Sequence, residues 1–181
     1  MRDKNSSITF FAGIHGVGKS TLSSKIKEII SLPNYSASEL ITMNNNEKYG
    51  KNKFVSDATK NQTILVESSK KILQEEGSFL MSGHFCIFNN DYSLNILPTT
   101  FFDEAPIKKI ILLVADIDKV IQNLKDRDDI TYKKSDLLAL QELEIEQAEK
   151  ISQSRKIPLH IYNMEFSDND IPNVIKLIYG E

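Results

Sequence analysis

The chain has 181 residues, of which 40% are hydrophobic and 26% charged, as is typical of one ordinary globular domain. Its net charge of −3, and the lack of any apolar run near the roughly 20 residues that a membrane-spanning helix needs, argue against nucleic-acid and membrane partners. A single cysteine, Cys86, excludes an internal disulfide, and no signal-peptide segment precedes the first predicted strand, so we expect a cytoplasmic protein.

The first predicted strand, Ile8–Ala12, is β-branched and aromatic, and apolar residues recur at helical spacing over Thr21–Ile30. The loop between them matches the phosphate-binding pattern G-x-x-x-x-G-K-[ST] at every fixed position. With the threonine that follows, it consists of Gly13, Ile14, His15, Gly16, Val17, Gly18, Lys19, Ser20 and Thr21. The glycines let the loop N–H groups point inward at an anion, and the helix adds the positive end of its dipole. The sequence therefore predicts a nucleotide-phosphate site at residues 13–21.

Two side chains of this loop are predicted to carry its chemistry. Lys19 supplies a full positive charge for the β- and γ-phosphates, and the Ser20 hydroxyl is a ligand for Mg²⁺. His15 fills a variable position, and we interpret it as a neutral loop residue without a catalytic role. The cofactor that these residues indicate is ATP with Mg²⁺.

The middle of the chain is predicted to contain a short second strand within residues 35–42. The polar segment Asn44–Lys53 is either a solvated surface loop or a flap that binds an acceptor over the phosphate site. A long helix is predicted from Val55 to Gln74. Gln62 interrupts its apolar face, which favours a buried, hydrogen-bonded glutamine over a contact to a ligand.

Strands and helices alternate along the rest of the chain. Further strands are predicted at Ser78–Met81, Lys109–Val114 and Ile157–Tyr162, and further helices at 118–125, 135–153 and 171–178. This alternation predicts an α/β fold with a parallel sheet that helices cover on both faces. The triplet Ser82-Gly83-His84 follows one of these strands, at the sheet edge where such folds bind ligands.

Several polar residues have a simpler structural interpretation. We expect Cys86 to pack as a small hydrophobe, because no helix terminus or basic neighbour near it would favour a thiolate. His160 lies inside a predicted strand and is interpreted as structural. The predicted helix over 135–153 has an apolar line and four acidic residues that we expect mostly on solvent faces. The line is Leu138, Ile145, Ala148 and Ile151, and the acids are Glu142, Glu144, Glu146 and Glu149.

Taken in order, several pieces of the chain resemble the nucleoside-monophosphate kinase group of P-loop proteins, and most closely archaeal-type adenylate kinases. They are the phosphate loop, Ser82-Gly83-His84, Leu97-Pro98, Ala115-Asp116, Arg127-Asp128, Gln141, Ala148 and Asn163. The resemblance implies a P-loop NTPase fold, with a five-stranded parallel sheet, helices on both faces and a short lid. It implies one kinase-like domain over residues 1–181, with an acceptor-side insert at about 35–76 and the lid at about 125–136.

The activity implied by this resemblance is transfer of the γ-phosphoryl group of MgATP to a small acceptor, a nucleotide or nucleoside. Lys19 and Arg127 would be the catalytic residues, because positioning and charge stabilisation dominate phosphoryl transfer. Arg127 would close over the phosphates from the lid and stabilise the transition state. The alternative for Arg127 is a surface salt bridge with Asp126, Asp128 or Asp129.

Two departures from the family pattern leave a second function open. Ser82 stands where an acidic residue is expected, and the chain has no arginine between the phosphate loop and the third strand to hold an acceptor's phosphate. Either lysines replace that arginine, or the acceptor is not a nucleoside monophosphate; the candidates are Lys48, Lys51, Lys53 and Lys60. The alternative function is a P-loop ATPase or nucleotide-dependent switch that acts on a partner protein.

Overall fold

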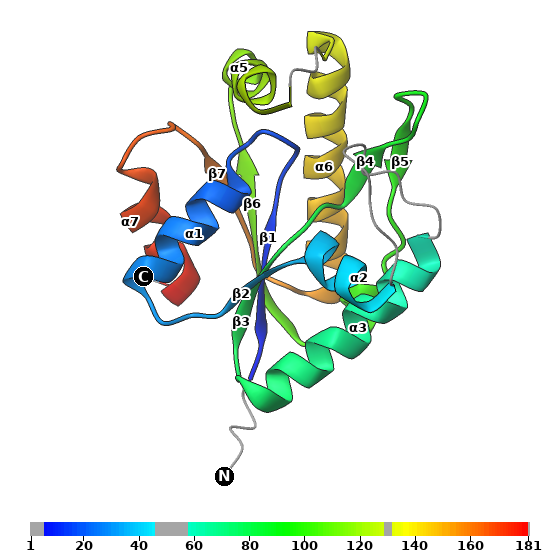
Figure 1. Cartoon of the computed structure of the whole chain (residues 1–181), viewed down its shortest axis with the longest axis vertical. Coiled ribbons are helices and arrows are strands. Elements are labelled where there is room, and N and C mark those ends of the chain that lie inside the picture. Colours follow the sequence, from blue (N-terminus) through cyan, green and yellow to red (C-terminus); the bar gives the residue numbers. More distant parts are fainter. Residues whose placement is uncertain (1–5, 46–57, 129–131, 181) are drawn as a thin grey trace.

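The computed structural model describes residues 6–45, 58–128 and 132–180. Its centre is a five-stranded sheet in the order β2-β3-β1-β6-β7, in which every neighbouring pair is parallel (Figure 1). The strands are β1 (Ile8–Ala12), β2 (Asn34–Ser36), β3 (Phe79–Ser82), β6 (Ile107–Val114) and β7 (Leu159–Asn163). The predicted α/β fold with a parallel sheet is therefore confirmed.

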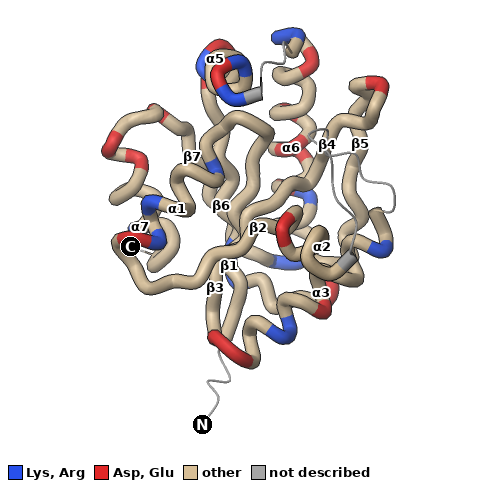
Figure 2. Tube along the Cα trace, viewed as in Figure 1, with Lys and Arg blue, Asp and Glu red and all other residues tan. Residues whose placement is uncertain are grey.

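Helices cover both faces of this sheet, with α1 and α7 on one side and α3, α4 and α6 on the other (Figure 1). The helices are α1 (Lys19–Ile29), α2 (Ala37–Asn45), α3 (Ala58–Glu75), α4 (Thr100–Glu104), α5 (Ile117–Asp128), α6 (Lys134–Arg155) and α7 (Asp170–Tyr179). Charged residues concentrate on these helices and their connections, whereas the central strands carry few of them (Figure 2). None of the helices in the described residues is both long and apolar enough to cross a membrane.

Strand β6 is buried on both faces, as a central parallel strand should be. Four successive residues, Ile110 to Leu113, have no exposed surface. Its one buried cation, Lys109, donates a hydrogen bond to the Ile178 carbonyl at 3.1 Å and a second to the Leu177 carbonyl. These carbonyls end α7, where the helix dipole favours a positive charge, so the buried ammonium is compensated.

A small antiparallel hairpin, β4 (Cys86–Phe88) with β5 (Leu94–Ile96), stands beside the sheet. Phe88 stacks on Tyr132, just before α6, with ring centroids 6.1 Å apart. The hairpin therefore packs against the chain that enters α6.

The short strand predicted within residues 35–42 occupies only the first two of them, because β2 ends at Ser36 and α2 begins at Ala37. The Ser36 N–H donates to Glu39 Oε2 at 3.4 Å, which is the capping-box arrangement that starts a helix. Most of the predicted polar loop Asn44–Lys53, and Val55 at the predicted start of the long helix, lie outside the described residues.

Candidate active site

The phosphate loop, residues 13–18, leaves the C-terminal end of β1 and leads directly into α1. Gly13 and Gly16 have φ angles of 145° and 78°, a region that side chains disfavour. A Cβ atom at Gly13 would lie 2.6 Å from the Leu113 carbonyl oxygen, and one at Gly16 would lie 2.7 Å from Leu124 Cγ. Both positions therefore require glycine, for backbone conformation and for the close approach of β6 and α5.

The first turn of α1 is built to face an anion. Gly18 is its N-cap and has no side chain that could accept the first-turn N–H groups, and the first turn contains no acidic residue. The unpaired N–H groups and the positive end of the helix dipole therefore remain available to a phosphate. Lys19, Ser20 and Thr21 occupy this turn, which the sequence predicted as the phosphate and magnesium site.

The Lys19 ammonium lies over the phosphate loop. Nζ donates to the Gly13 carbonyl and, at 3.0 Å, to the Ile14 carbonyl. Since these acceptors are neutral, a phosphate oxygen would be the stronger partner for the ammonium. The side chain is thus held within reach of the position where the loop N–H groups would hold a phosphate.

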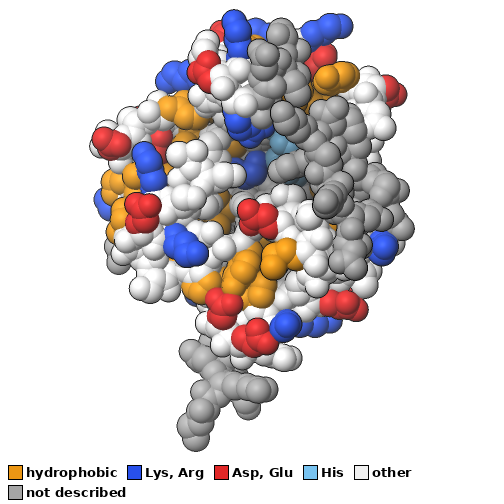
Figure 3. Space-filling view, in the orientation of Figure 1, with side chains coloured by type: hydrophobic (Ala, Val, Ile, Leu, Met, Phe, Trp, Pro, Cys, Tyr) orange, Lys and Arg blue, Asp and Glu red, His pale blue; other side chains and the backbone are white. Residues whose placement is uncertain are grey.

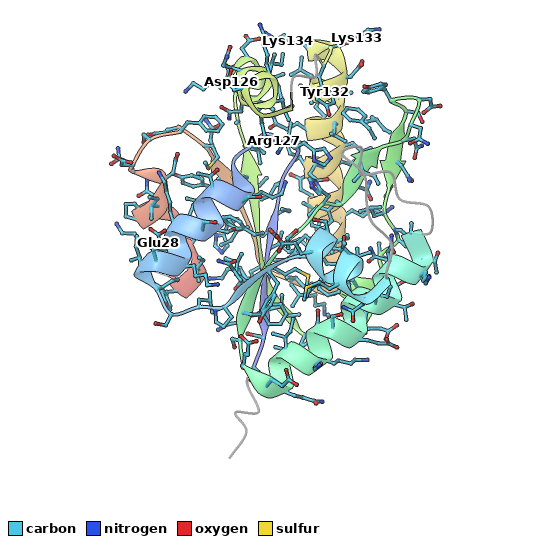
Figure 4. The ribbon with its side chains drawn as sticks, viewed as in Figure 1. Glu28, Asp126, Arg127, Tyr132, Lys133 and Lys134 are labelled. Atoms are coloured by element: carbon cyan, nitrogen blue, oxygen red, sulfur yellow. The ribbon has the colours of Figure 1, made fainter. Side chains whose placement is uncertain are left out.

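Helix α5 packs directly on the phosphate loop and carries Arg127. Asn123 Nδ2 donates to the Gly16 carbonyl at 2.9 Å, which fixes α5 to the loop. Arg127 lies one helical turn further on, in the last turn of α5, and lines the cleft beside the phosphate loop. Figure 4 shows it below the end of α5, whereas Lys133 and Lys134 at the start of α6 point outward. The predicted lid over 125–136 therefore begins as helix, and residues 129–131 lie outside the described residues.

The donor set fits a magnesium ion that arrives with the nucleotide rather than one held by the protein alone. Ser20 is exposed and lines the cleft at the start of α1. Ser82, where an acid was expected, donates its hydroxyl to the Tyr35 carbonyl at 3.4 Å. Among the described residues, no group of three or more His, Cys, Asp or Glu side chains is arranged for a metal. Mg²⁺ keeps several waters and is bound largely through substrate phosphates, so Ser20 stays the predicted protein ligand.

Two histidines that line the cleft contact one another. His15 of the phosphate loop and His84, which follows β3, have ring centroids 4.4 Å apart. Figure 3 shows histidine atoms beside Lys or Arg atoms at the bottom of a hollow in this face. The sequence places one of these residues in the phosphate loop and the other after a predicted strand, but it does not predict that they contact one another.

The prediction that the acidic residues of α6 mostly face solvent is confirmed for Glu142, Glu146 and Glu149, and Glu144 is the exception. Its side chain is 1% exposed, and its carboxylate accepts the N–H groups of Phe85 and Cys86, the latter at 2.7 Å. Burial raises the pKa of Glu144 to about 7, and the Phe85 N–H, the Lys19 charge and the N–H groups of Cys86 and Gly13 oppose this shift. One buried carboxylate therefore joins α6 to the phosphate loop and to the segment after β3.

The prediction that Cys86 packs as a small hydrophobe is confirmed. The residue has no exposed surface. Burial, and next the charge of Glu144, raise the pKa of its thiol far above the ordinary range. Cys86 therefore remains a thiol at neutral pH and is not a nucleophile.

A second residue of α6 holds the end of strand β6. Gln141 Oε1 accepts the Ala115 N–H, and Gln141 Nε2 donates to the Ala115 carbonyl, both at 3.0 Å. The pair of bonds satisfies both backbone groups where the strand ends. Gln141 therefore fixes the end of β6 beside the site. Gln141 and Glu144 are the two polar side chains through which α6 supports the cleft.

The phosphate loop forms one side of a cleft of about 1160 Å³, and α2, α3 and the end of β3 form the other. We call this second side the acceptor side. Its described lining residues include Ser38, Glu39, Ile41, Thr42, Asn61, Gln62, Leu65 and His84. Lys60, one of the predicted phosphate-binding lysines, is exposed on α3 and is not among the lining residues; the other three lie outside the described residues.

The prediction of a buried, hydrogen-bonded glutamine at Gln62 is only partly confirmed. The side chain is buried, as predicted, with 6% of its surface exposed. However, its Oε1 atom accepts no hydrogen bond within the part of the chain that the structure describes. The glutamine is therefore buried but not satisfied, and it lines the cleft.

The arrangement of sheet, glycine loop and helix defines a P-loop fold of the kinase-like type. A family model described as an AAA domain matches residues 12–156, which is most of the chain. The chain therefore belongs to this AAA domain family. No curated protein sequence matches it.

Solved structures with a similar fold include several kinases. A sugar kinase from Janibacter sp. superposes with a TM-score of 0.62 at 12% identity, covering 95% of this chain and 93% of that one. A shikimate kinase from Bacteroides thetaiotaomicron gives 0.58 at 13% identity, covering 97% and 99%. A gluconokinase from Sinorhizobium meliloti 1021 gives 0.54 at 13% identity, covering 96% and 95%. At these identities the likeness shows the fold.

Proposed function

We propose that this chain is an ATP-dependent phosphotransferase that moves the γ-phosphoryl group of MgATP to a small acceptor. One observation carries the proposal: the phosphate loop and the polar acceptor side line the same cleft. A triphosphate held by the loop would present its terminal phosphate to a molecule held by α2, α3 and β3. The sugar, shikimate and gluconate kinases of similar fold support the same reaction class.

Each predicted site residue has a role in this reaction. The loop N–H groups and Lys19 bind and orient the β- and γ-phosphates, and Ser20 holds the magnesium ion that neutralises part of their charge. Arg127 stabilises the negative charge of the transition state from the end of α5. Closure of the predicted lid, at about 125–136, over the nucleotide would exclude water and limit wasteful hydrolysis.

The acceptor in this proposal is a nucleotide or nucleoside, as the likeness to archaeal-type adenylate kinases implies. The acceptor side supports this class, because it combines amide side chains with apolar ones. Asn61 and Gln62 lie next to each other on α3, and Leu65 and Ile41 line the cleft near them. Amides of this kind pair with the edges of nucleobases, while apolar side chains contact their faces.

The test is transfer of labelled phosphate from Mg[γ-³²P]ATP to a panel of acceptors. The panel contains AMP, adenosine, other nucleosides and monophosphates, gluconate, shikimate and hexoses. We expect ADP formation that depends on one class of acceptor, together with a labelled product. ADP formation at one rate with every acceptor would contradict the kinase proposal and favour an ATPase or switch that acts on a partner protein.

A further inference from the structure

Two helices begin at the cleft, and their first turns are built in opposite ways. The first turn of α1 contains no acidic residue, and its N-cap, Gly18, has no side chain. The first turn of α2 instead carries Glu39, and Ser36, Ser38 and Glu39 all line the cleft. The positive end of the α2 dipole, unlike that of α1, is therefore already matched by a carboxylate of the chain itself.

Hydrogen bonds at the start of α2 fix where this carboxylate lies. Oε2 of Glu39 accepts the Ser36 N–H at 3.4 Å, and the Oγ atoms of Ser36 and Ser38 are 2.8 Å apart. The carboxylate thus stands beside residues that line the cleft, and the Glu39 side chain is exposed. Since a carboxylate has about four acceptor positions, the bond to Ser36 leaves most of them available to a molecule in the cleft.

The charged side chains that line the cleft are distributed unevenly between its two sides. In the described part of the chain, the lining cations are Lys19, Lys25 and Arg127, and the lining anions are Glu39, Asp126, Asp168 and Asp170. The cations belong to α1 and to α5, which packs on the phosphate loop, and no described lysine or arginine of α2 or α3 lines the cleft. The anions already match these cations, and MgATP adds further negative charge. A second phosphate group, with a charge of about −1.5 to −2 at pH 7, would meet Glu39 rather than a described cation on the acceptor side.

We infer that the acceptor carries no phosphate group and that Glu39 determines this specificity, with its carboxylate accepting hydrogen bonds from hydroxyl groups of the acceptor. The inference rests on the proposed function and narrows its acceptor to the unphosphorylated class. An ionised carboxylate only accepts, and its charge strengthens bonds from hydroxyl donors while it repels a phosphate. Two sources share this chemistry: the ribose hydroxyls of a nucleoside and the hydroxyls of a free sugar.

The helix cap permits a matched substitution. Glutamine serves at the same capping-box position as glutamate, so Glu39→Gln keeps the start of α2 and removes the charge. Glu67→Gln is the control, because Glu67 is exposed on α3 and is not among the residues that line the cleft. We expect the Tm of both variants to lie within about 2 °C of the parent. A Tm that falls by several degrees in Glu39→Gln alone would assign the carboxylate to the fold and overturn the inference.

The main measurement is transfer of labelled phosphate from Mg[γ-³²P]ATP to matched pairs of acceptors. The pairs are adenosine with AMP, guanosine with GMP, uridine with UMP, and D-glucose with glucose 6-phosphate, so that they also distinguish a nucleoside from a free sugar. For the pair that the parent uses, we expect kcat/KM to be at least about 10-fold higher with the unphosphorylated member.

The variants test whether Glu39 is responsible for this preference. In Glu39→Gln, the KM of the unphosphorylated acceptor should rise by about 10-fold with little change in kcat, and the preference over the phosphorylated member should narrow. Glu67→Gln should match the parent in both values. A higher kcat/KM with the phosphorylated member, or the same acceptor KM in Glu39→Gln and the parent, would overturn the inference.

The two proposals fail separately. Transfer to phosphorylated members alone would leave the kinase proposal standing and overturn the inference. If no acceptor takes up the label, calorimetric binding of the same pairs, with Mg²⁺ and a non-hydrolysable ATP analogue present, decides between them. Binding of an unphosphorylated member that weakens about 10-fold in Glu39→Gln would then support the role of Glu39 and contradict the kinase proposal. No binding of any unphosphorylated member to the parent would overturn the inference.

Discussion

The two sides of the cleft differ in how their polar groups are satisfied. On the phosphate side, Lys19 donates to two loop carbonyls, and Asn123 satisfies the carbonyl of Gly16. Behind the loop, the Glu144 carboxylate accepts hydrogen bonds from the backbone N–H groups of Phe85 and Cys86. On the acceptor side, the Oε1 atom of Gln62 is buried without a partner in the described residues.

This difference separates a side whose polar groups already bind one another from a side that keeps a buried oxygen without a partner in the described residues. Groups that already hold one another cost little reorganisation when a phosphate arrives, which is the condition for electrostatic stabilisation of a transition state. An unsatisfied buried oxygen instead destabilises the folded chain, because it has lost water without gaining a donor. Substitutions on the phosphate side should therefore affect turnover or stability.

The largest effect that this comparison predicts is that of Lys19→Ala. Loss of the ammonium removes the full positive charge at the transferring phosphate, and we expect kcat for ADP formation to fall by about 1,000-fold or more. The measurement is steady-state turnover of MgATP with the best acceptor of the panel. Lys27→Ala is the control, because Lys27 lies exposed in the last turn of the same helix and should leave kcat unchanged. Unchanged turnover in Lys19→Ala would remove this residue from the mechanism.

The next largest effect concerns stability, and it tests whether the phosphate side depends on the support of α6. Glu144→Ala leaves the N–H groups of Phe85 and Cys86 without an acceptor in a buried site. We expect it to lower the free energy of unfolding by about 3 kcal/mol, measured by urea denaturation. The exposed Glu142 on the same helix provides the control, since Glu142→Ala should change stability by less than about 0.5 kcal/mol. Similar small effects for both variants would contradict the role given to Glu144.

Arg127→Ala should have a somewhat smaller effect, and on catalysis rather than on stability. If Arg127 stabilises charge that develops only in the transition state, kcat falls by about 100-fold while the affinity for ATP changes little. The measurements are kcat and the Kd of MgATP by calorimetry. Lys125→Ala removes an exposed cation from the same turn of α5 and should alter neither value. Equal losses in kcat and ATP affinity would assign Arg127 to ground-state binding.

The parts of this structure that the sequence predicted are those whose signals are local. The phosphate loop is a short pattern with fixed residue types, and each glycine has a local reason in the backbone conformation. Strand β6 is a continuous apolar run, which identifies a strand buried on both faces before any neighbour is known. The alternation of such strands with helices was sufficient to predict the parallel sheet.

The parts that were missed depend on contacts between distant segments. The buried face of α6 has regular helical spacing, but two of its members, Glu144 and Gln147, are polar, so the predicted apolar line is right at Ala148 and Ile151 and wrong at its N-terminal end. Leu138, predicted inside, is 40% exposed, whereas Leu137 and Leu140 are fully buried. Nothing near Glu144 in the sequence shows that its partners are backbone groups almost 60 residues earlier, since the separation is 59 residues for Phe85. In the sequence, a carboxylate that accepts buried hydrogen bonds cannot be distinguished from a solvated one, because its donors become neighbours only in the folded chain.

The same carboxylate gives the smallest prediction, a pH dependence of stability. Burial raises the pKa of Glu144 from its ordinary value of 4.5 to about 7, so the folded chain holds a proton in a pH range where the unfolded chain has released it. The contribution of Glu144 to stability is therefore fully present below about pH 4.5, falls as the pH rises, and is lost above about pH 7. Between pH 6 and pH 8 the free energy of unfolding should fall by about 1 kcal/mol more in the parent than in Glu144→Gln, which cannot ionise. Parallel urea titrations of the two chains at each pH isolate this term, because every other titrating group is common to both. Identical slopes would mean that the N–H donors of Phe85 and Cys86 and the charge of Lys19 outweigh burial and keep the carboxylate ionised throughout.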